Sequence, residues 1–198
     1  MRYILSVLAG YFLGALSCSI ILSKAKYLMD IRRDGSGNAG ATNMARVHGM
    51  GAGLLTLGGD MLKTALAGGI GWLLAGRPGL IAACAACLIG HCWPVYYRFK
   101  GGKGVSVAVM IALLLDWKML LILAVIFFGV FALSRRVSLC SVISALCFTP
   151  VYLLCGNPRD GGLALCIATA VVVIFCHRSN IRRLLRREEP PFVPGKKR

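Results

Sequence analysis

Long apolar runs separated by short polar segments dominate this chain. The runs predict helical spans near residues 3–23, 53–75, 79–97, 105–115, 119–134, 139–155 and 161–177. A single helix over 105–134 would be about 45 Å long, too long for a hydrocarbon core of about 30 Å, so we expect a break at Asp116. The pattern therefore predicts an all-α, polytopic integral membrane protein with about seven transmembrane helices.

The apolar runs also define the domain organisation. They leave no stretch long enough for a separate soluble domain, so we expect residues 1–198 to form one transmembrane domain with a basic tail over 178–198. The first run begins like a signal peptide but continues past any cleavage site, which indicates an uncleaved first helix. The last predicted loop falls at 156–160.

Basic residues are distributed unevenly between the loops. The chain has 23 Lys and Arg against 7 Asp and Glu, a net charge of +16. Most of the basic residues fall in 24–46, 98–103, 135–136 and 178–198, whereas the remaining loops carry Arg2, Arg77, Lys118 and Arg159. The positive-inside rule then places the N-terminus outside and the C-terminus in the cytoplasm. Because the charges flank apolar spans, they predict contact with membrane lipid and not with nucleic acid.

Nine cysteines raise the question of a metal or disulfide. Almost all of them lie inside apolar runs, and the one CxxC pair, Cys84 and Cys87, has no second pair to complete a zinc site. We therefore expect them to act as small apolar side chains, with no metal and no cofactor.

A glycine-rich segment, GSGNAGATN, follows the first span. Its backbone and its side chains could bind an anion, through Gly35, Ser36, Gly37, Asn38, Gly40, Thr42 and Asn43. The segment contains the letters GxGxxG, but no βαβ unit surrounds it, and Ala41 stands where a P-loop has its Lys. Two interpretations stay open: a tight re-entrant turn that caps a helix, or a phosphate site.

A second glycine-rich segment, KGGKG, precedes the span that starts at 105. It consists of Lys100, Gly101, Gly102, Lys103 and Gly104. A helix N-terminus presents free N–H groups and the positive end of the helix dipole, and a lysine there favours phosphate. The alternative is that Lys103 only anchors the helix at the cytoplasmic surface.

Other polar residues lie within or beside the spans. Asp60 and Lys63 have the i, i+3 spacing of an ion pair, and His91 is interpreted as a packing residue near a kink at Pro94. His177 and Asn180 would share a helix face, where they either cap the helix or contact a substrate, with His177 as a donor or a base. We expect an aromatic belt at the membrane surface from Trp93, Tyr96 and Tyr97.

Five segments together resemble the bacterial acyl-phosphate:glycerol-3-phosphate acyltransferases, the PlsY family. They are GSGNAGATN (35–43), DMLK (60–63), GHCWPVYYRFKGGKGV (90–105), SRRVSLCS (134–141) and HRSNIRRLL (177–185). The resemblance covers nearly the whole chain. The chain departs from the family pattern at Ala39, Thr64, Ser106 and Arg187, none of which we assign to the chemistry.

The resemblance implies a multi-pass enzyme of the bacterial inner membrane with its active site facing the cytoplasm. It would transfer a fatty acyl group from acyl phosphate to the 1-hydroxyl of glycerol 3-phosphate, the first acylation of phospholipid synthesis, and it would need no obligatory protein partner. The implied catalytic residues are Ser36, Arg46, Lys103, His177 and Asn180. Ser141 and the two glycine-rich segments would bind substrate, and the acyl chain would lie in a groove between helices.

Two other classes of protein fit a polytopic chain with anion-binding loops. A transporter of a small phosphorylated anion predicts an internal repeat or broken helices that meet at the membrane midplane, and no repeat is visible. A non-catalytic membrane scaffold would not need several polar glycine-rich segments on one side.

Overall fold

The structure is a computed structural model that describes residues 1–155 and 161–195. These residues are helical, without a strand, so the all-α prediction is confirmed for them. The helices are α1 (Arg2–Ala15), α2 (Cys18–Tyr27), α3 (Ala41–His48), α4 (Met50–Cys92), α5 (Val105–Leu115), α6 (Trp117–Ser134), α7 (Val137–Cys155), α8 (Gly162–Cys176) and α9 (Arg178–Leu185), with short 3-10 helices η1 (Ile31–Arg33) and η2 (Val95–Tyr97). The loop predicted at 156–160, which contains Arg159, lies outside the described residues.

The first predicted span is not one continuous helix. Leu16 has an extended backbone, and Ser17 caps the start of α2 by accepting a hydrogen bond from the Ile20 N–H at 3.5 Å. The chain therefore bends between α1 and α2 inside the span predicted near 3–23, while Arg2–Tyr27 as a whole is long and apolar enough to cross a membrane. A serine oxygen that satisfies a free backbone N–H allows a helix to restart in this way.

Helix α4 reverses direction in its middle, as the separate spans predicted over 53–75 and 79–97 indicate. Ala75 and Gly76 have non-helical backbone angles, and the segments on either side pack so closely that Gly71 and Gly79 contact each other's backbones. The second segment ends at Cys92, earlier than the predicted 97. Pro94 lies beyond the helix end, so the predicted kink at Pro94 is absent.

The predicted break at Asp116 is confirmed. Its backbone is extended, with φ −162°, and its carboxylate accepts a hydrogen bond from the Lys118 N–H at 2.7 Å. This cap ends α5 after 11 residues and starts α6.

Several helices of the described residues are long and apolar enough to cross a membrane. By length and composition they are Arg2–Tyr27, Met50–Tyr97, Trp117–Ser134 and Val137–Cys155, with a fifth if α8 and α9, bent by 60°, are taken as one. Large apolar side chains cover their outer surfaces; Leu133, for example, is 92% exposed. Such surfaces are suited to lipid contact.

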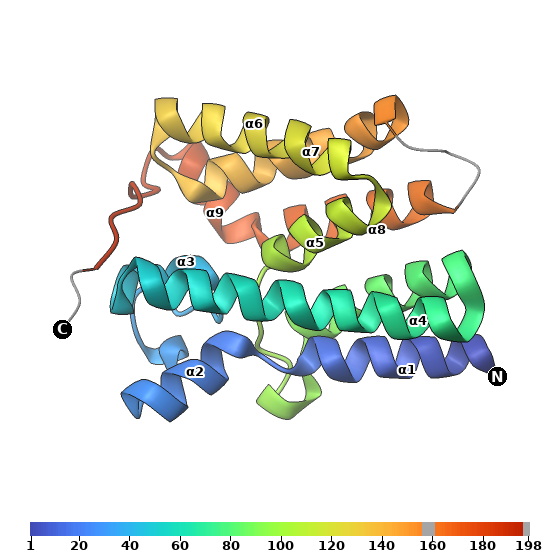
Figure 1. The fold of residues 1–198 in the computed structure, drawn as a ribbon. Helices are drawn as coiled ribbons and strands as arrows, with labels where there is room; N and C mark the ends of the chain where they lie inside the picture. The colour runs from blue at the N-terminus through green and yellow to red at the C-terminus, as the bar shows by residue number, and fades with distance from the viewer. Residues whose placement is uncertain (156–160, 196–198) are drawn as a thin grey trace.

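The helices form one bundle with its polar loops gathered at one end. Figure 1 shows α1 along α4, and α6 packed on α7. The short helices α3 and α9 lie at the end of the bundle that also holds the C-terminal tail (Figure 1). The apolar core lies among α4, α5, α7 and α8, with Tyr152, Ile111 and Leu165 fully or almost fully buried. This arrangement brings the first glycine-rich segment, Lys103 of the second and part of the tail to one cavity.

Candidate active site

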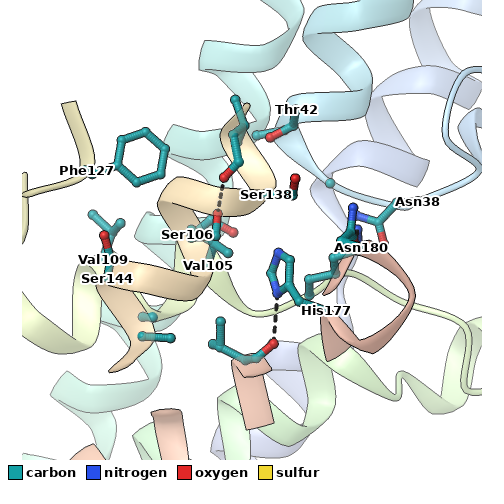
Figure 2. A pocket seen from close by; sticks show the side chains of 18 of the residues that line it. Asn38, Thr42, Val105, Ser106, Val109, Phe127, Ser138, Ser144, His177 and Asn180 are labelled. Atoms are coloured by element: carbon teal, nitrogen blue, oxygen red, sulfur yellow. Dashed lines mark hydrogen bonds between the residues drawn. The ribbon is translucent and has the colours of Figure 1, made fainter. Parts of the chain in front are cut away.

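One cavity of about 760 Å³ connects the polar loops to the interior of the helix bundle. Its volume falls in the range typical of small-molecule sites. Of the predicted site residues, it is lined by Gly35, Ser36, Asn38, Gly40, Thr42, Asn43, Arg46, Lys103, Ser141, His177 and Asn180. Figure 2 shows Asn38, Thr42 and Asn180 on one side of the cavity, and Val109 and Phe127 on the other. The cavity therefore has a polar end and an apolar end.

Asn43 holds the first glycine-rich loop in shape. Its side-chain oxygen accepts from the Ser36 N–H at 2.8 Å, and its amide nitrogen donates to the carbonyl oxygens of Ile31 at 3.1 Å and Asp34 at 2.9 Å. Asn43 is only 1% exposed. Through these three hydrogen bonds Asn43 shapes the loop that carries the exposed Ser36. Arg46 follows about one turn later on α3.

The second glycine-rich loop packs directly on the end of α4. The N–H groups of Gly101 and Gly102 donate to the carbonyl oxygens of Cys92 and His91 at 3.2 and 3.1 Å. A Cβ atom on Gly102 would overlap the ring nitrogen Nε2 of His91, and Gly104 has φ +84°, which favours glycine. These glycines, together with Gly37, do not line the cavity. They bring the loop close to α4 and place Lys103 at the cavity.

Lys103 belongs to a chain of hydrogen bonds that joins three parts of the sequence. Its ammonium group donates to Asn180 Oδ1 at 2.5 Å. The Asn180 amide nitrogen donates to Glu189 Oε1 at 2.7 Å, and Arg183 Nε donates to Glu189 Oε2 at 2.6 Å. Glu189 and Arg183 were not among the predicted site residues. The one sequence signal for them was their position in the basic tail, a few residues after His177 and Asn180.

Burial changes the protonation of this network. The pKa of Lys103 is lowered to about 8, mainly by burial and also by the nearby positive charges of Arg183 and Arg46, against the opposing effect of Glu189. Burial alone would raise the pKa of Glu189, but hydrogen bonds from Arg183 and Asn180 hold it below its usual value. At neutral pH the network therefore contains a lysine cation and a carboxylate.

His177 stands at the junction of α8 and α9, buried and facing the cavity (Figure 2). Its Nδ1 lies 2.8 Å from the carbonyl oxygen of Val173. A carbonyl oxygen only accepts, so Nδ1 carries the proton and Nε2 of the neutral ring is an acceptor. The sequence left open whether His177 donates a hydrogen bond to a substrate or accepts one. The contact with Val173 favours Nε2 as an acceptor.

The apolar end of the cavity extends deep between the helices. Its lining includes Ala112, Leu123, Phe148 and Thr169, from α5, α6, α7 and α8. Thr169 precedes His177 by eight residues on α8, a distance of about 12 Å along a helix. The cavity thus has the shape of a pocket for an elongated apolar chain with a charged head.

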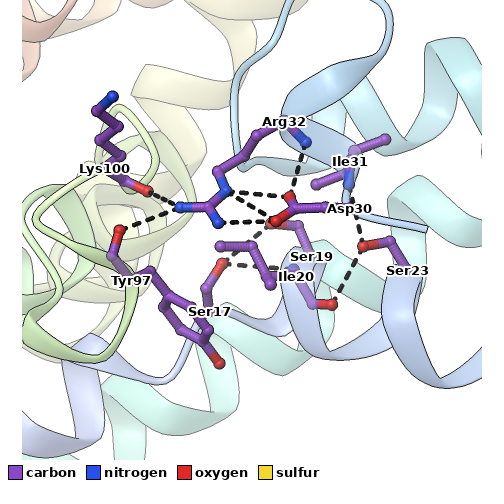
Figure 3. Close-up of polar contacts among 9 residues, drawn as sticks. All are labelled: Ser17, Ser19, Ile20, Ser23, Asp30, Ile31, Arg32, Tyr97 and Lys100. Carbon is purple, nitrogen blue, oxygen red and sulfur yellow. Dashed lines mark hydrogen bonds and ion pairs between the residues drawn. The ribbon is translucent and has the colours of Figure 1, made fainter. Parts of the chain in front are cut away.

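Arg32 links the two glycine-rich loops, a role that no sequence pattern indicated (Figure 3). Its guanidinium pairs with Asp30 at 2.7 Å and donates to the carbonyl oxygens of Tyr97 at 3.0 Å and Lys100 at 3.4 Å. The hydrogen bond from Arg32 lowers the pKa of Asp30 to about 2. Arg32 thus links the start of the first loop to the segment that leads into Lys103.

We expect Arg32→Met to reduce kcat/KM for glycerol 3-phosphate, the acceptor that the sequence resemblance implies, about tenfold, the equivalent of losing one charge-assisted hydrogen bond. Arg32→Lys should have a kcat/KM close to that of Arg32→Met, because one ammonium group cannot replace the planar guanidinium that reaches Asp30 and both carbonyl groups. The matched control is Arg33→Met, since Arg33 is exposed. Steady-state kinetics of the three variants test this, and equal kinetics for Arg32→Met and Arg33→Met would contradict it.

The C-terminal tail crosses the polar end of the cavity. The Phe192 N–H donates to the carbonyl oxygen of Arg135 at 2.7 Å, and the Gly195 N–H donates to that of Ala45 at 3.1 Å. Arg136 Nε donates to the Glu189 carbonyl oxygen at 2.8 Å. The tail therefore connects the α6–α7 loop to α3, and Glu189 and Phe192 line the cavity.

The chain is similar to known enzymes over almost its whole length. A family model described as glycerol-3-phosphate acyltransferase matches residues 4–187. The glycerol-3-phosphate acyltransferase of Finegoldia magna is 38% identical over 196 residues, which cover 96% of this chain and 97% of that protein. That of Chromobacterium violaceum is 42% identical over 190 residues, which cover 92% and 91%.

Solved structures agree with these relatives. The structure of PlsY, an integral membrane glycerol 3-phosphate acyltransferase, in its glycerol 3-phosphate form superposes with a TM-score of 0.90 at 31% identity, covering 98% of this chain and 96% of that one. Its lysophosphatidic acid form gives 0.88 at 30% identity, with the same coverage. The chain therefore belongs to the family of membrane-embedded glycerol-3-phosphate acyltransferases.

Proposed function

We propose that this enzyme transfers a fatty acyl group from acyl phosphate to the 1-hydroxyl of glycerol 3-phosphate, giving lysophosphatidic acid and inorganic phosphate. Family membership establishes the acyltransferase and disfavours the transporter. The observation that supports the proposed donor is the continuity of this cavity, which joins a cationic end to a deep apolar end. An acyl phosphate has this pattern of charge and chain.

The polar end offers groups for two phosphates. We assign glycerol 3-phosphate to Arg46, Lys103 and Asn180, with Ser36 and Ser141 beside them. The phosphate of the donor would lie against the first glycine-rich loop, where Asn38 and Thr42 add polar side chains to the lining. The acyl chain would occupy the apolar end between α5 and α8.

The reaction requires positioning more than activation. The 1-hydroxyl oxygen attacks the acyl carbonyl carbon, a new ester C–O bond forms, and the bond between that carbon and the phosphate oxygen breaks. We propose that Nε2 of His177 first accepts the hydrogen bond of the hydroxyl and orients its oxygen for attack, and that the hydroxyl proton then moves to the departing phosphate as the bond between carbon and phosphate oxygen breaks. No cofactor enters the reaction, because the donor already carries a good leaving group.

We further propose the bacterial inner membrane as the location, with about seven spans, the N-terminus outside and the active site facing the cytoplasm. The number is supported if the two segments of α4, on either side of its reversal, count as two spans and α5 counts as a short span. The basic loops support the orientation, because Arg32, Lys103, Arg135 and the tail all meet at one end of the bundle. Residues 1–198 would act as one domain without an obligatory protein partner.

Purified protein in detergent, supplied with palmitoyl phosphate and glycerol 3-phosphate, tests the proposal. The expected result is equimolar lysophosphatidic acid and inorganic phosphate. Palmitoyl-CoA in place of palmitoyl phosphate should give no product. Acylation from palmitoyl-CoA without phosphate release from palmitoyl phosphate would overturn the proposed donor while leaving the acyltransferase family intact.

A further inference from the structure

Two charged side chains and a histidine are buried together beside the second glycine-rich loop. Asp60, Lys63 and His91, all on α4, are 1%, 5% and 4% exposed. The Lys63 ammonium nitrogen lies 2.9 Å from Asp60 Oδ1 and 3.0 Å from His91 Nδ1, and it donates to the carbonyl oxygen of Leu16 at 2.7 Å. The predicted Asp60–Lys63 ion pair is confirmed, and His91 is a member of the same cluster. Ionisable groups are unfavourable inside a membrane protein and often mark functional interiors.

Lys63 determines which nitrogen of the His91 ring carries the proton. An ammonium group only donates, so Nδ1 must accept, and the proton of the neutral ring lies on Nε2. Nε2 faces the junction of the two glycine-rich loops, because a Cβ atom on Gly102 would contact both Nε2 and the Ala39 carbonyl oxygen. His91 lines the cavity, and among the described residues Nε2 makes no hydrogen bond. This N–H group is available to a ligand.

The same cluster fixes a second cavity residue. Ser106, in the first turn of α5, donates its hydroxyl hydrogen bond to Asp60 Oδ2 at 3.0 Å and lines the cavity. Three residues earlier is Lys103, at the polar end, and three residues later is Val109, at the apolar end. His91 and Ser106 therefore stand at the boundary between the two ends. The carbonyl group of an acyl phosphate has to lie at this boundary, because its phosphate is polar and its chain is apolar.

We propose that His91 is a catalytic residue whose Nε2–H donates a hydrogen bond to the carbonyl oxygen of the acyl phosphate, and that Lys63 and Asp60 are the positioning residues that hold its ring. The proposal rests on the proposed function, which makes acyl phosphate the occupant. Negative charge develops on this oxygen when the hydroxyl attacks, so a fixed donor stabilises the transition state more than the ground state. His91 and His177 thus hold opposite tautomers, one as donor and one as acceptor.

A comparison of stability with turnover separates positioning from structural support. Lys63→Met should lower the thermal midpoint, because it leaves Asp60 as an unpaired buried charge. The double variant Asp60→Leu/Lys63→Met should restore the midpoint, since apolar pairs commonly replace buried ion pairs without loss. Its kcat should nevertheless stay at least about tenfold below that of the wild type, because the ring is no longer held. Recovery of kcat together with the midpoint would overturn the positioning role.

Two substitutions of His91 test the donor itself. His91→Leu should lower kcat about 100-fold, the effect of removing one donor to a developing oxyanion, with KM for glycerol 3-phosphate unchanged. His91→Gln keeps an N–H near the position of Nε2 and should retain most of kcat. Wild-type kcat in His91→Leu, or equal losses in both variants, would overturn the catalytic assignment.

Nitrogen NMR of protein labelled with ¹⁵N-histidine reports the tautomers without turnover. The chain has 3 histidines, so their signals can be assigned by substitution. We expect the proton of His91 on Nε2 and that of His177 on Nδ1, with the His91 preference lost in the double variant. A proton on Nδ1 of His91 would overturn the inference even if the enzyme is active. Failure of the proposed function would be distinct, since wild-type protein would then release no phosphate from palmitoyl phosphate.

Discussion

Replacement of Lys103 by alanine is expected to reduce kcat/KM for glycerol 3-phosphate about 100- to 1,000-fold. The substitution removes a cation that is fixed by Asn180 and placed by the second glycine-rich loop where a phosphate would enter. Losing one preorganised donor in a partly buried site commonly has an effect of this size. Steady-state kinetics with both substrates varied would measure it, and a thermal midpoint would show that the variant folds.

Lys100→Ala is the matched control for this variant. Lys100 belongs to the same loop, but its side chain is exposed, and its contact with Arg32 uses the backbone carbonyl oxygen. We expect its kcat/KM to stay within about twofold of the wild type, as for most exposed substitutions. Equal activity of Lys103→Ala and Lys100→Ala would remove the phosphate-binding role and leave Lys103 as a membrane anchor.

The pH dependence of kcat/KM tests the role of the Lys103 ammonium group independently. Because burial lowers the Lys103 pKa to about 8, the charge that attracts phosphate is present at neutral pH and is lost as pH rises through about 8. The profile of kcat/KM, which reports the free enzyme, should therefore fall above about pH 8. Lys103→Arg stays charged in this range, so its alkaline limb should move to higher pH.

Replacement of His177 by alanine is expected to lower turnover about 100-fold, because the hydroxyl that attacks the acyl carbonyl loses its acceptor. His177→Gln distinguishes orientation from proton abstraction. A glutamine side chain can accept a hydrogen bond near the position of Nε2 but cannot act as a base at neutral pH. If the departing phosphate of the donor takes the hydroxyl proton, His177→Gln should keep most of kcat.

The opposite result for His177→Gln would change the mechanism. Unchanged affinity for glycerol 3-phosphate with turnover abolished would identify His177 as the general base. Isothermal titration of glycerol 3-phosphate, measured beside kcat for both variants, separates these outcomes. A loss of binding without a loss of turnover at saturation would instead restrict His177 to substrate binding.

The helical architecture could be predicted because apolar periodicity and turn residues are local properties. The breaks at Gly76 and Asp116 follow from single residues that end a helix, through a positive φ and through a side-chain cap. The break at Leu16 and Ser17 was missed, because one serine in an apolar run predicts a cap only when its hydroxyl faces the free N–H groups. Residues 3–23 contain no charged residue that would mark this break in the sequence.

The sequence by itself determined a basic, helical membrane protein, and it predicted two anion-binding loops with Arg46, Lys103, His177 and Asn180 among the site residues. Glycine, lysine and helix termini carry that chemistry locally. Only the tertiary structure decided that Lys103 meets Asn180 and Glu189, that Arg32 joins the two loops, and that Lys63 orients His91. These partners lie far apart along the chain, and their pairing depends on how the helices pack, which no local pattern of residues encodes.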